Sequence, residues 1–315
     1  MSVDERAMAE PHVAIVILNW NGKEDVLRCL STLPRIRYPS WSATVIDNAS
    51  TDGSVAAIKE RFPDQRVLVM EKNLGFCGGN NRGIADALNR GAEYVLLLNN
   101  DTELHPDLLT ELVRVARTDV RIGAVGAKNL LLEDPRIVWG AYGEIRYHRD
   151  LVHLVGSRLP DNPELTCIKD VDWVIGNGMM LSRSAVESVG GFDETFFGYH
   201  EDVDWCARAR KAGFRIVYNG HAVIYHRGFG AANPARPRPF PVLYFLGRNS
   251  ILFAKKHASP AQLCKFVTLF FLGVGWWIVT GVFRGDRVKS YLWLVRGFID
   301  GVRGRLPLRE LGLQE

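Results

Sequence analysis

The chain has 315 residues, of which 47% are hydrophobic and 23% are charged, and its formal net charge is +4. This is the composition of a globular protein with ample apolar material for a core. No long block of lysine or arginine dominates, so we expect no nucleic-acid binding. The five cysteines form no C-x-x-C pair. Their odd number argues against a disulfide framework or a structural zinc site and favours a reducing compartment.

Residues 1–11 form a polar tail of mixed charge. The tail lacks the basic start and apolar centre of a signal peptide, so we expect no export. The chain shows neither an internal repeat nor a low-complexity tract.

The first half of the chain alternates short apolar runs with helical patterns. Strands are predicted at 13–19, 43–50, 66–71 and 92–101, and helices at 23–33, 53–61, 80–91 and 105–118. Apolar strands separated by helices indicate a mainly parallel sheet with helices on both faces. The predicted fold class is therefore an open, Rossmann-like α/β sheet of the nucleotide-binding kind.

The pattern after residue 120 is less regular. We expect a helix at 200–214, two strands within 214–228, and a loop in the proline- and arginine-rich segment 231–241. A linker and helix are expected at 231–257, before a helical C-terminal region at 258–315.

Polar residues stand where three of the predicted strands end. Asn19, Asp47 and Asp101 each follow an apolar run. One such residue is ordinary turn chemistry, but three at one sheet edge favour a site, because ligands bind outside the carboxyl ends of parallel strands. Asp101, with Asn99 and Asn100, offers the oxygen ligands that Mg²⁺ or Mn²⁺ takes together with substrate phosphates.

Several nucleotide-binding and catalytic motifs are absent. The sequence NWNG at 19–22 stands where a dinucleotide-binding protein has its glycine fingerprint. The sequence contains no P-loop motif, no G-x-S-x-G and no H-E-x-x-H. These absences argue against a nicotinamide dehydrogenase, a P-loop enzyme, a serine hydrolase of that type and a zinc protease.

Six segments, in this order, closely resemble family 2 glycosyltransferases, and among them the bacterial rhamnosyltransferase-type enzymes of cell-surface polysaccharide synthesis. The segments are VAIVILNWNG, DNASTDGS, NLGFCGGNNRG, LLLNNDTEL, GNGMML and GGFDETFFGYHEDVDWCARARKAGF. The resemblance covers residues 12–257. It implies a GT-A fold, a nucleotide-diphosphate sugar donor and an inverting mechanism. The catalytic domain would be 12–230, with a nucleotide-sugar half at 12–101 and an acceptor half at 102–230.

The resemblance also implies roles for individual residues. Asp202 would be the catalytic base, and Asp101 and His226 would hold a divalent cation, Mg²⁺ or Mn²⁺. The acceptor-side residues would be Gly178, Glu201 and Trp205. The nucleotide-sugar contacts would be Asn19, Asn21, Asp47, Asn48, Asp52, Asn73, Gly75, Gly79, Asn80, Asn99 and Asn100. Asn99 stands where the family's D-x-D element has its first Asp, which leaves Asp101 as the main ligand.

The residue types leave other interpretations open. Acidic residues are favoured at helix starts, so Glu201 and Asp204 have an ordinary explanation, and Asp204 can pair with Arg208. Trp205 either packs in the core or floors the acceptor pocket. His226 is either structural or a ligand.

The glycines at 75, 78 and 79 have two explanations as well. They either form a tight turn or let the backbone approach the donor. The hydrogen-bonding capacity of Asn80 and Asn81 beside them favours the second.

The apolar run 266–283 lies between Lys265 and Arg284 and is at the lower limit for a membrane-spanning helix. Basic and aromatic neighbours suit a helix that lies at a membrane interface. We therefore expect interfacial attachment first, a core or oligomer-forming helix second and a true span third. The expected location is the cytoplasmic face of the bacterial inner membrane, where a lipid-linked acceptor would lie.

The expected activity is transfer of one sugar to a lipid-linked or saccharide acceptor. Rhamnose carried on dTDP is the first candidate by resemblance, and the oligomeric state is open. The alternatives are a sugar nucleotidyltransferase and a non-catalytic, membrane-attached partner protein. A sugar nucleotidyltransferase needs a glycine- and lysine-rich loop after the first strand, and the segment NWNG does not provide it. Asn99 slightly favours the non-catalytic partner protein, whereas intact Asp101 and Asp202 oppose that alternative.

Overall fold

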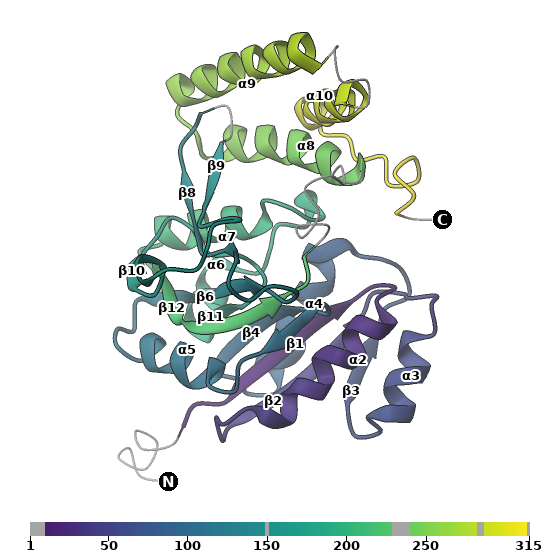
Figure 1. Cartoon of the computed structure of the whole chain (residues 1–315), viewed down its shortest axis with the longest axis vertical. Coiled ribbons are helices and arrows are strands. Elements are labelled where there is room, and N and C mark those ends of the chain that lie inside the picture. Colours follow the sequence, from purple (N-terminus) through teal and green to yellow (C-terminus); the bar gives the residue numbers. More distant parts are fainter. Residues whose placement is uncertain (1–9, 149–150, 229–239, 282–286, 314–315) are drawn as a thin grey trace.

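The computed structural model describes residues 10–148, 151–228, 240–281 and 287–313. In this part of the chain, a ten-stranded sheet forms the centre of the lower body, and helices cover both of its faces (Figure 1). Three further helices stand above this body, next to a two-stranded hairpin. The predicted α/β fold class is confirmed.

Four parallel strands form the first half of the sheet. They are β1 (Val13–Asn19), β2 (Trp41–Asp47), β3 (Arg66–Val69) and β4 (Tyr94–Asn99), and β1 lies between β2 and β4. The helices that follow the first three strands are α2 (Lys23–Thr32), α3 (Ser54–Arg61) and α4 (Gly75–Asn89). The parallel order arises because each connection passes through a helix that covers the sheet.

Strand β1 is buried on both faces, which explains its continuous apolar sequence. Val13, Ile15 and Ile17 belong to the core beneath α2 and α3. Ala14 and Val16 belong to the opposite core, beneath α4. The sheet therefore separates two hydrophobic cores, and its strand ends are the places where polar side chains gather.

The second half of the sheet mixes strand directions. Strand β11 (Met179–Ser182) is antiparallel to both of its neighbours, β4 and β6 (Ile122–Leu131). Strand β12 (Arg215–His226) runs parallel to β6. Shorter antiparallel strands complete the edge: β5 (Thr102–Leu104) and β10 (Ile168–Asp170) pair with β12, and β7 (Val138–Gly140) pairs with β6.

The prediction of two strands within 214–228 was wrong. A single strand, β12, crosses the region, with an irregular register between Asn219 and Val223. The polar residues at this point form a bulge in one strand, because both flanking segments stay paired with β6.

The helices of the second half are α5 (Leu108–Ala116), α6 (Arg183–Val189) and α7 (Glu201–Lys211). Helix α7 begins within the acidic run and ends before Gly213, whose φ of +92° suits a glycine after a helix. The hairpin of β8 (Tyr142–Ile145) and β9 (Val152–Val155) stands apart from the main sheet (Figure 1). The predicted helix at 200–214 is confirmed.

Helix α4 begins at Gly75, five residues before the predicted start at 80. A Cβ atom on Gly83 would lie 2.3 Å from Cγ1 of Val16, and one on Gly79 would lie 2.4 Å from Cδ1 of Leu18. The glycines therefore allow α4 to lie close against β1. Their low helix propensity hides the first turn of the helix from a sequence pattern.

The C-terminal region consists of α8 (Phe240–His257), α9 (Pro260–Gly281) and α10 (Arg287–Arg303). Helices α8 and α10 approach so closely that a Cβ on Gly297 would lie 2.0 Å from the carbonyl oxygen of Tyr244. Helix α9 packs through Phe270, whose ring stacks on Phe298 at 4.6 Å.

Among the described residues, no helix is long and apolar enough to cross a membrane. Most of the predicted loop 231–241 and the end of the run 266–283 lie outside the described residues.

We predict that Gly83→Ala destabilises the fold. The gain in helix propensity is about 1 kcal/mol. The clash with the stiff, buried Val16 side chain outweighs this gain and lowers the free energy of unfolding by about 1–3 kcal/mol net. Urea denaturation measures the difference. The matched control is Gly275→Ala in α9, where a Cβ meets nothing within 4 Å and the substitution should be neutral or stabilising.

Candidate active site

The carboxyl ends of β1, β2 and β4 bring together three loops that were predicted to bind the donor. Asn19 and Asp47 are register partners, and Asn99 is paired with Leu18. Nδ2 of Asn19 donates to Oδ2 of Asp47 at 3.0 Å, and Nδ2 of Asn100 donates to Oδ1 of Asn19 at 2.7 Å. Asn19 therefore links the loop after β2 to the loop after β4.

Asp47 is fully buried, and both of its carboxylate oxygens accept hydrogen bonds. Oδ2 accepts from Asn19, and Oδ1 accepts from the backbone N–H of Ser50 at 2.9 Å. In this structure the carboxylate fixes the shape of the loop after β2. Asn21 and Asp52, by contrast, are exposed on the rim of the same loops.

Asn48 fixes the next loop in the same way. Its Nδ2 donates to Oδ1 of Asn73 and to the carbonyl of Gly75, both at 2.9 Å, and its Oδ1 accepts from the N–H of Leu74. Gly75 has a φ of +73°, and a Cβ there would lie 2.5 Å from the carbonyl oxygen of Phe197. The structure therefore brings Asn48, Asn73 and Gly75 together against the turn that precedes α7.

The close packing of Gly79 against Leu18 is a sufficient reason for a glycine at this position, and no contact with the donor is needed to explain it. Asn80 lies within α4 and donates through Nδ2 to the carbonyl of Phe76 at 3.0 Å. Its Oδ1 is buried and, in the described part of the chain, has no hydrogen-bond partner.

Asp101 and His226 meet because of a long-range strand pairing. Strand β5 follows Asp101 directly and pairs antiparallel with the end of β12, so that Thr102 is the register partner of His226. Nε2 of His226 lies 3.0 Å from Oδ1 of Asp101. The imidazole also contacts Trp139 edge to face, with ring centroids 4.7 Å apart.

The Asp101–His226 pair contains buried polar atoms whose hydrogen-bonding capacity is not satisfied. Within the described residues, Oδ1 of Asp101 and both ring nitrogens of His226 are buried and have no partner of acceptable geometry. A buried polar group without a partner costs about 1–3 kcal/mol. A carboxylate oxygen and an imidazole nitrogen are both metal ligands, so the pair fits a divalent cation that takes its remaining ligands from elsewhere. No group of three or more histidine, cysteine, aspartate or glutamate side chains that could hold a metal ion occurs in the described parts of the chain.

Asn177, which the sequence reasoning missed, holds the loop after β4. Its Oδ1 accepts from the backbone N–H of Asn99 at 3.0 Å and lies 3.1 Å from Oγ1 of Thr102. The residue is buried at 3% exposure. An asparagine inside the apolar stretch 174–181 was the available signal, because a buried amide must find partners.

Asp202 lies in the first turn of α7 and is partly buried. Its Oδ2 accepts from the backbone N–H of Gly176 at 2.9 Å, and its Oδ1 accepts from the N–H of Val203. Burial raises the pKa of Asp202 to about 6, although these two hydrogen bonds favour the charged form. At neutral pH the side chain is a carboxylate with a higher proton affinity than a free aspartate.

Burial shifts both neighbours of Asp202 toward their neutral forms. Burial, followed by the charge of Asp202, raises the pKa of Glu201 well above its ordinary value. Burial also lowers the pKa of His200 to about 4. Oε2 of Glu201 is buried without a hydrogen-bond partner among the described residues. Of these two adjacent carboxyl groups, only Asp202 has two backbone hydrogen bonds given for its oxygens, and these favour its charged form.

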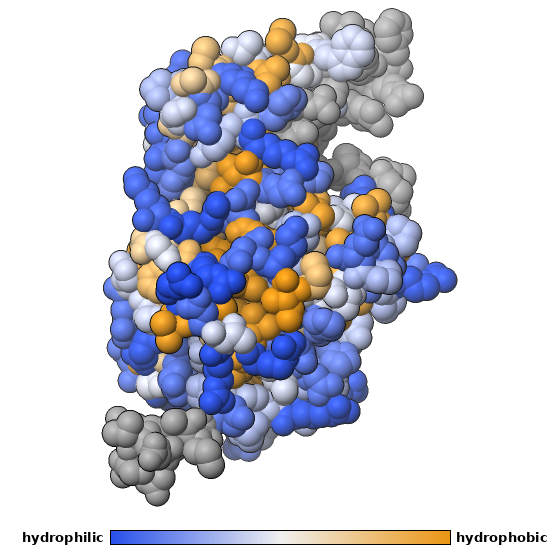
Figure 2. Space-filling view, turned by 90° about the vertical axis from the view of Figure 1, so that its left-hand side faces the viewer, coloured by the Kyte–Doolittle hydropathy of each residue, from blue (hydrophilic) through white to orange (hydrophobic). Residues whose placement is uncertain are grey.

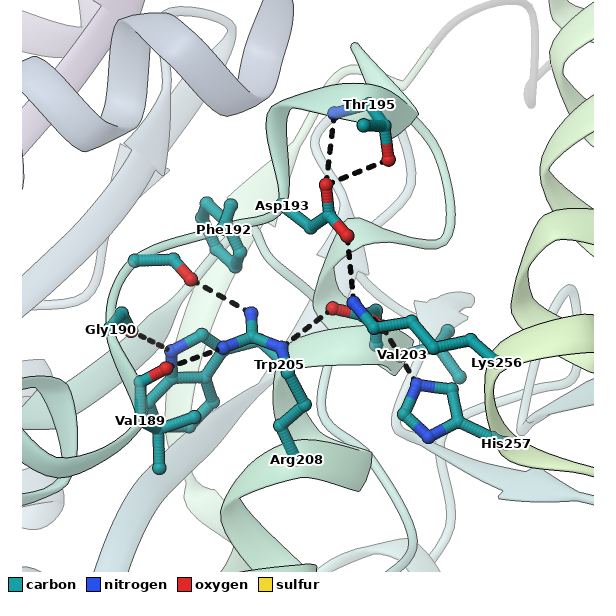
Figure 3. Close-up of polar contacts among 12 residues, drawn as sticks. Val189, Gly190, Phe192, Asp193, Thr195, Val203, Trp205, Arg208, Lys256 and His257 are labelled. Atoms are coloured by element: carbon teal, nitrogen blue, oxygen red, sulfur yellow. Dashed lines mark hydrogen bonds and ion pairs between the residues drawn. The ribbon is translucent and has the colours of Figure 1, made fainter. Parts of the chain in front are cut away.

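Packing explains two of the three residues that were predicted on the acceptor side. Trp205 is fully buried and donates through its indole N–H to the carbonyl of Gly190 at 2.9 Å, so it is a core residue (Figure 3). Gly178 has a φ of +81°, and a Cβ there would lie 2.9 Å from Cδ1 of Ile224. Packing and backbone conformation thus explain this glycine.

Asp204 anchors α7 from its buried face. Its carboxylate contacts Arg208 at 2.8 Å, Lys256 at 2.9 Å and His257 at 2.7 Å. Figure 3 shows these three partner side chains. Burial alone would raise the pKa of Asp204, but hydrogen bonds from His257, Lys256 and Arg208 outweigh it and lower that pKa to about 2. The predicted Asp204–Arg208 pair is confirmed, and α8 contributes Lys256 and His257 as two further partners.

A Rossmann-like sheet with a polar loop after β4 and a raised-pKa carboxyl at the start of α7 has the architecture of a glycosyltransferase with the GT-A fold. The family described as "Glycosyltransferase like family 2" matches residues 11–238. The chain belongs to this family.

Two proteins of described function show the range of its relatives. The N-acetylglucosaminyl-diphospho-decaprenol L-rhamnosyltransferase of Mycobacterium tuberculosis is 30% identical over 234 residues, which are 67% of this chain and 75% of that protein. The low-salt glycan biosynthesis hexosyltransferase Agl10 of Haloferax volcanii is 25% identical over 320 residues, which are 93% and 92% of the two chains.

Solved structures confirm the GT-A fold. The mannosyltransferase PcManGT from Pyrobaculum calidifontis, in complex with GDP-Man and Mn²⁺, aligns with a TM-score of 0.52 at 16% identity over 95% of this chain and 89% of that one. GalNAc-T7 with UDP, GalNAc and Mn²⁺ aligns with a TM-score of 0.58 at 14% identity over 78% of this chain and 48% of that one.

Proposed function

We propose that the protein is an inverting glycosyltransferase that moves one sugar from a nucleotide-diphosphate sugar to a lipid-linked or saccharide acceptor in cell-surface polysaccharide synthesis. The observation that carries the proposal is the link between two chemical groups. Gly176 binds the carboxylate of Asp202, and the next residue, Asn177, binds the backbone of Asn99 in the cation loop. A base and a diphosphate-holding loop are thereby kept in one fixed arrangement.

In the proposed reaction, the acceptor hydroxyl oxygen attacks the anomeric carbon of the donor sugar. Its proton passes to the carboxylate of Asp202, and the bond between the anomeric carbon and the diphosphate oxygen breaks. The raised pKa of Asp202 makes it a stronger base than a free aspartate while leaving it ionised at pH 7. Burial and the charge of Asp202 raise the pKa of the neighbouring Glu201 well above its ordinary value and favour its neutral form, so Asp202 is assigned as the base.

Asp101 and His226 would hold a divalent cation, Mg²⁺ or Mn²⁺. When bound, such a cation neutralises charge on the leaving diphosphate. The buried, unpartnered atoms of this pair support the assignment, and so do the Mn²⁺ ions named with two structures of the same fold. Asn99 and Asn100 lie beside the pair and add uncharged polar groups to the loop.

On the donor side, exposure separates the residues that only shape the loops from those that can also meet the nucleotide. Asn19, Asp47 and Asn48 are buried and shape the loops. Asn21 and Asp52 accept backbone hydrogen bonds within the same loops, but they are exposed and can also contact the nucleotide. Trp20, which is 40% exposed, adds an aromatic face beside them. The sequence reasoning did not single out this tryptophan.

The first candidate donor is dTDP-rhamnose, and the first candidate acceptor is a polyprenyl diphosphate sugar. The name of the mycobacterial relative supports rhamnose as the sugar and a polyprenyl diphosphate sugar as the acceptor, whereas the dTDP carrier rests on the family resemblance alone. The location that suits this acceptor is the cytoplasmic face of the bacterial inner membrane, where the protein would be peripheral.

The C-terminal helices support membrane attachment. Phe271, Leu272 and Trp276 of α9 are 44–66% exposed, and Lys265 lies exposed on the same helix. Figure 2 shows hydrophobic surface among hydrophilic surface at this end of the molecule. Apolar side chains with a basic flank suit the interface of an anionic bilayer. The alternative of a purely core helix accounts only for the buried side, formed by Phe266 and Phe270.

We predict that Asp202→Asn keeps nucleotide binding but lowers kcat by about 10²-fold or more, because the amide cannot accept the acceptor proton. The matched control is Glu201→Gln. It replaces a carboxyl group whose burial favours the neutral form, and it should change kcat by less than about 10-fold. Steady-state transfer assays measure both. Near wild-type turnover of the Asp202 variant would refute the assignment of the base.

The pH dependence of kcat/KM should show an acid limb near pH 6. Below that value Asp202 is protonated and cannot act as a base, so activity is lost as pH falls through about 6. An acid limb near pH 4, the value of an unperturbed aspartate, would show that the buried carboxyl does not control the reaction.

We predict that Leu272→Glu and Trp276→Glu each weaken binding to vesicles of mixed anionic and neutral phospholipids. Each buried apolar side chain contributes about 1.5–3 kcal/mol, so the loss should be about 10-fold or more. Sedimentation with the vesicles measures it. The matched control is Val120→Glu, at a 91% exposed apolar position of the lower body, and its binding should not change. Equal binding of all variants would exclude α9 as the attachment surface.

A further inference from the structure

The turn before α7 has an unusual backbone. Phe197, Tyr199 and His200 have φ values of +62°, +68° and +69°. Residues other than glycine rarely adopt this left-handed backbone conformation, and it persists only where the surrounding structure enforces it. The turn ends two residues before Asp202, so whatever enforces its shape also sets the direction of the base.

Asn249 of α8 contacts this turn. Its Nδ2 lies within hydrogen-bond distance of three carbonyl oxygens, those of Phe196 at 2.9 Å, Gly198 at 2.7 Å and Tyr199 at 2.8 Å. The Phe196 carbonyl also accepts from the N–H of Gly198 within the turn. Asn249 is fully buried. One side-chain amide thus contacts the backbone carbonyls along the left-handed turn.

Arg248 orients that amide and holds the start of the turn. Its Nη1 donates to Oδ1 of Asn249 at 2.8 Å and to the carbonyl of Thr195 at 2.8 Å, and its Nε donates to the carbonyl of Arg305 at 2.7 Å. The charge-assisted bond to Oδ1 fixes which end of the Asn249 amide faces the turn. Arg248 is 3% exposed, so water does not compete for these contacts.

The next residue of α8 holds the end of the turn. Oγ of Ser250 lies 3.2 Å from Nε2 of His200. The carbonyl of His200 accepts from the N–H of Asp204 and starts the hydrogen bonding of α7. Three consecutive residues of α8 therefore contact the segment 195–200 from its first residue to its last.

We propose that Asn249, oriented by Arg248, is a positioning residue for the catalytic base. It holds the left-handed turn so that the carboxylate of Asp202 points to Gly176 and to the acceptor. The inference rests on the proposed function, in which Asp202 is the base. It makes the C-terminal helices a part of the catalytic apparatus and not only an attachment to the membrane.

The test compares the full-length wild type with Asn249→Ala and Asn249→Ser. Amide hydrogen exchange of peptides covering 195–204 needs no substrate. Exchange should be at least about 10-fold faster in Asn249→Ala and intermediate in Asn249→Ser, whose hydroxyl can still donate one bond. Tyr218→Phe is the stability control, because it removes a buried hydrogen bond to Leu165 far from the turn. It should leave exchange in this segment unchanged.

The activity assay uses dTDP-rhamnose and a short-chain polyprenyl diphospho-N-acetylglucosamine. In Asn249→Ala, kcat should fall by about 10²-fold, with nucleotide binding unchanged and the acid limb moved away from pH 6. Asn249→Ser should lose less, and Tyr218→Phe should keep the wild-type profile. Unchanged exchange at 195–204, or a kcat loss no larger than that of Tyr218→Phe, would overturn the proposal. If the wild type transfers no sugar, the proposed substrates fail, and the exchange result still decides the positioning role.

Discussion

The candidate site depends on hydrogen bonds from two adjacent residues, Gly176 and Asn177. One binds the carboxylate of Asp202, and the other binds the backbone of Asn99, so a single peptide bond separates the attachment of the proposed base from that of the proposed cation loop. This pair of residues lies just before β11, the antiparallel strand between β4 and β6. Strand β11 therefore joins the parallel half of the sheet to its mixed half at the point where these two attachments lie.

The C-terminal helices extend this arrangement. Helix α8 contacts the turn before α7 through Asn249 and contacts Asp204 through Lys256 and His257. Helix α9 packs with α8 and α10, and it exposes apolar side chains such as Trp276. Attachment to a membrane and orientation of the base would then involve one packed unit. The expected boundary near residue 230 separates the sheet from helices that contact the turn before α7 and Asp204.

The sequence predicted the elements of the site whose position follows from local rules. Asn19 and Asp47 meet because parallel strands end at one edge. His226 was assigned only through the family resemblance, because its contact with the cation loop arises from pairing of β5 with β12, which no local pattern reveals. For Trp205 the sequence left both the core and the acceptor pocket open, because a helix start does not tell which face packs, and the structure buries the side chain. Asn177 was missed because its partners are distant in the chain.

The most direct test is calorimetric titration of the protein with dTDP, UDP and GDP, each with and without Mn²⁺. The account predicts that one nucleotide binds, that Mn²⁺ strengthens its binding, and that His226→Ala removes the effect of the metal, because Asp101 and His226 are the proposed ligands. Binding that is equally strong without Mn²⁺, or no binding of any nucleotide, would contradict a cation-dependent donor site at the end of β4.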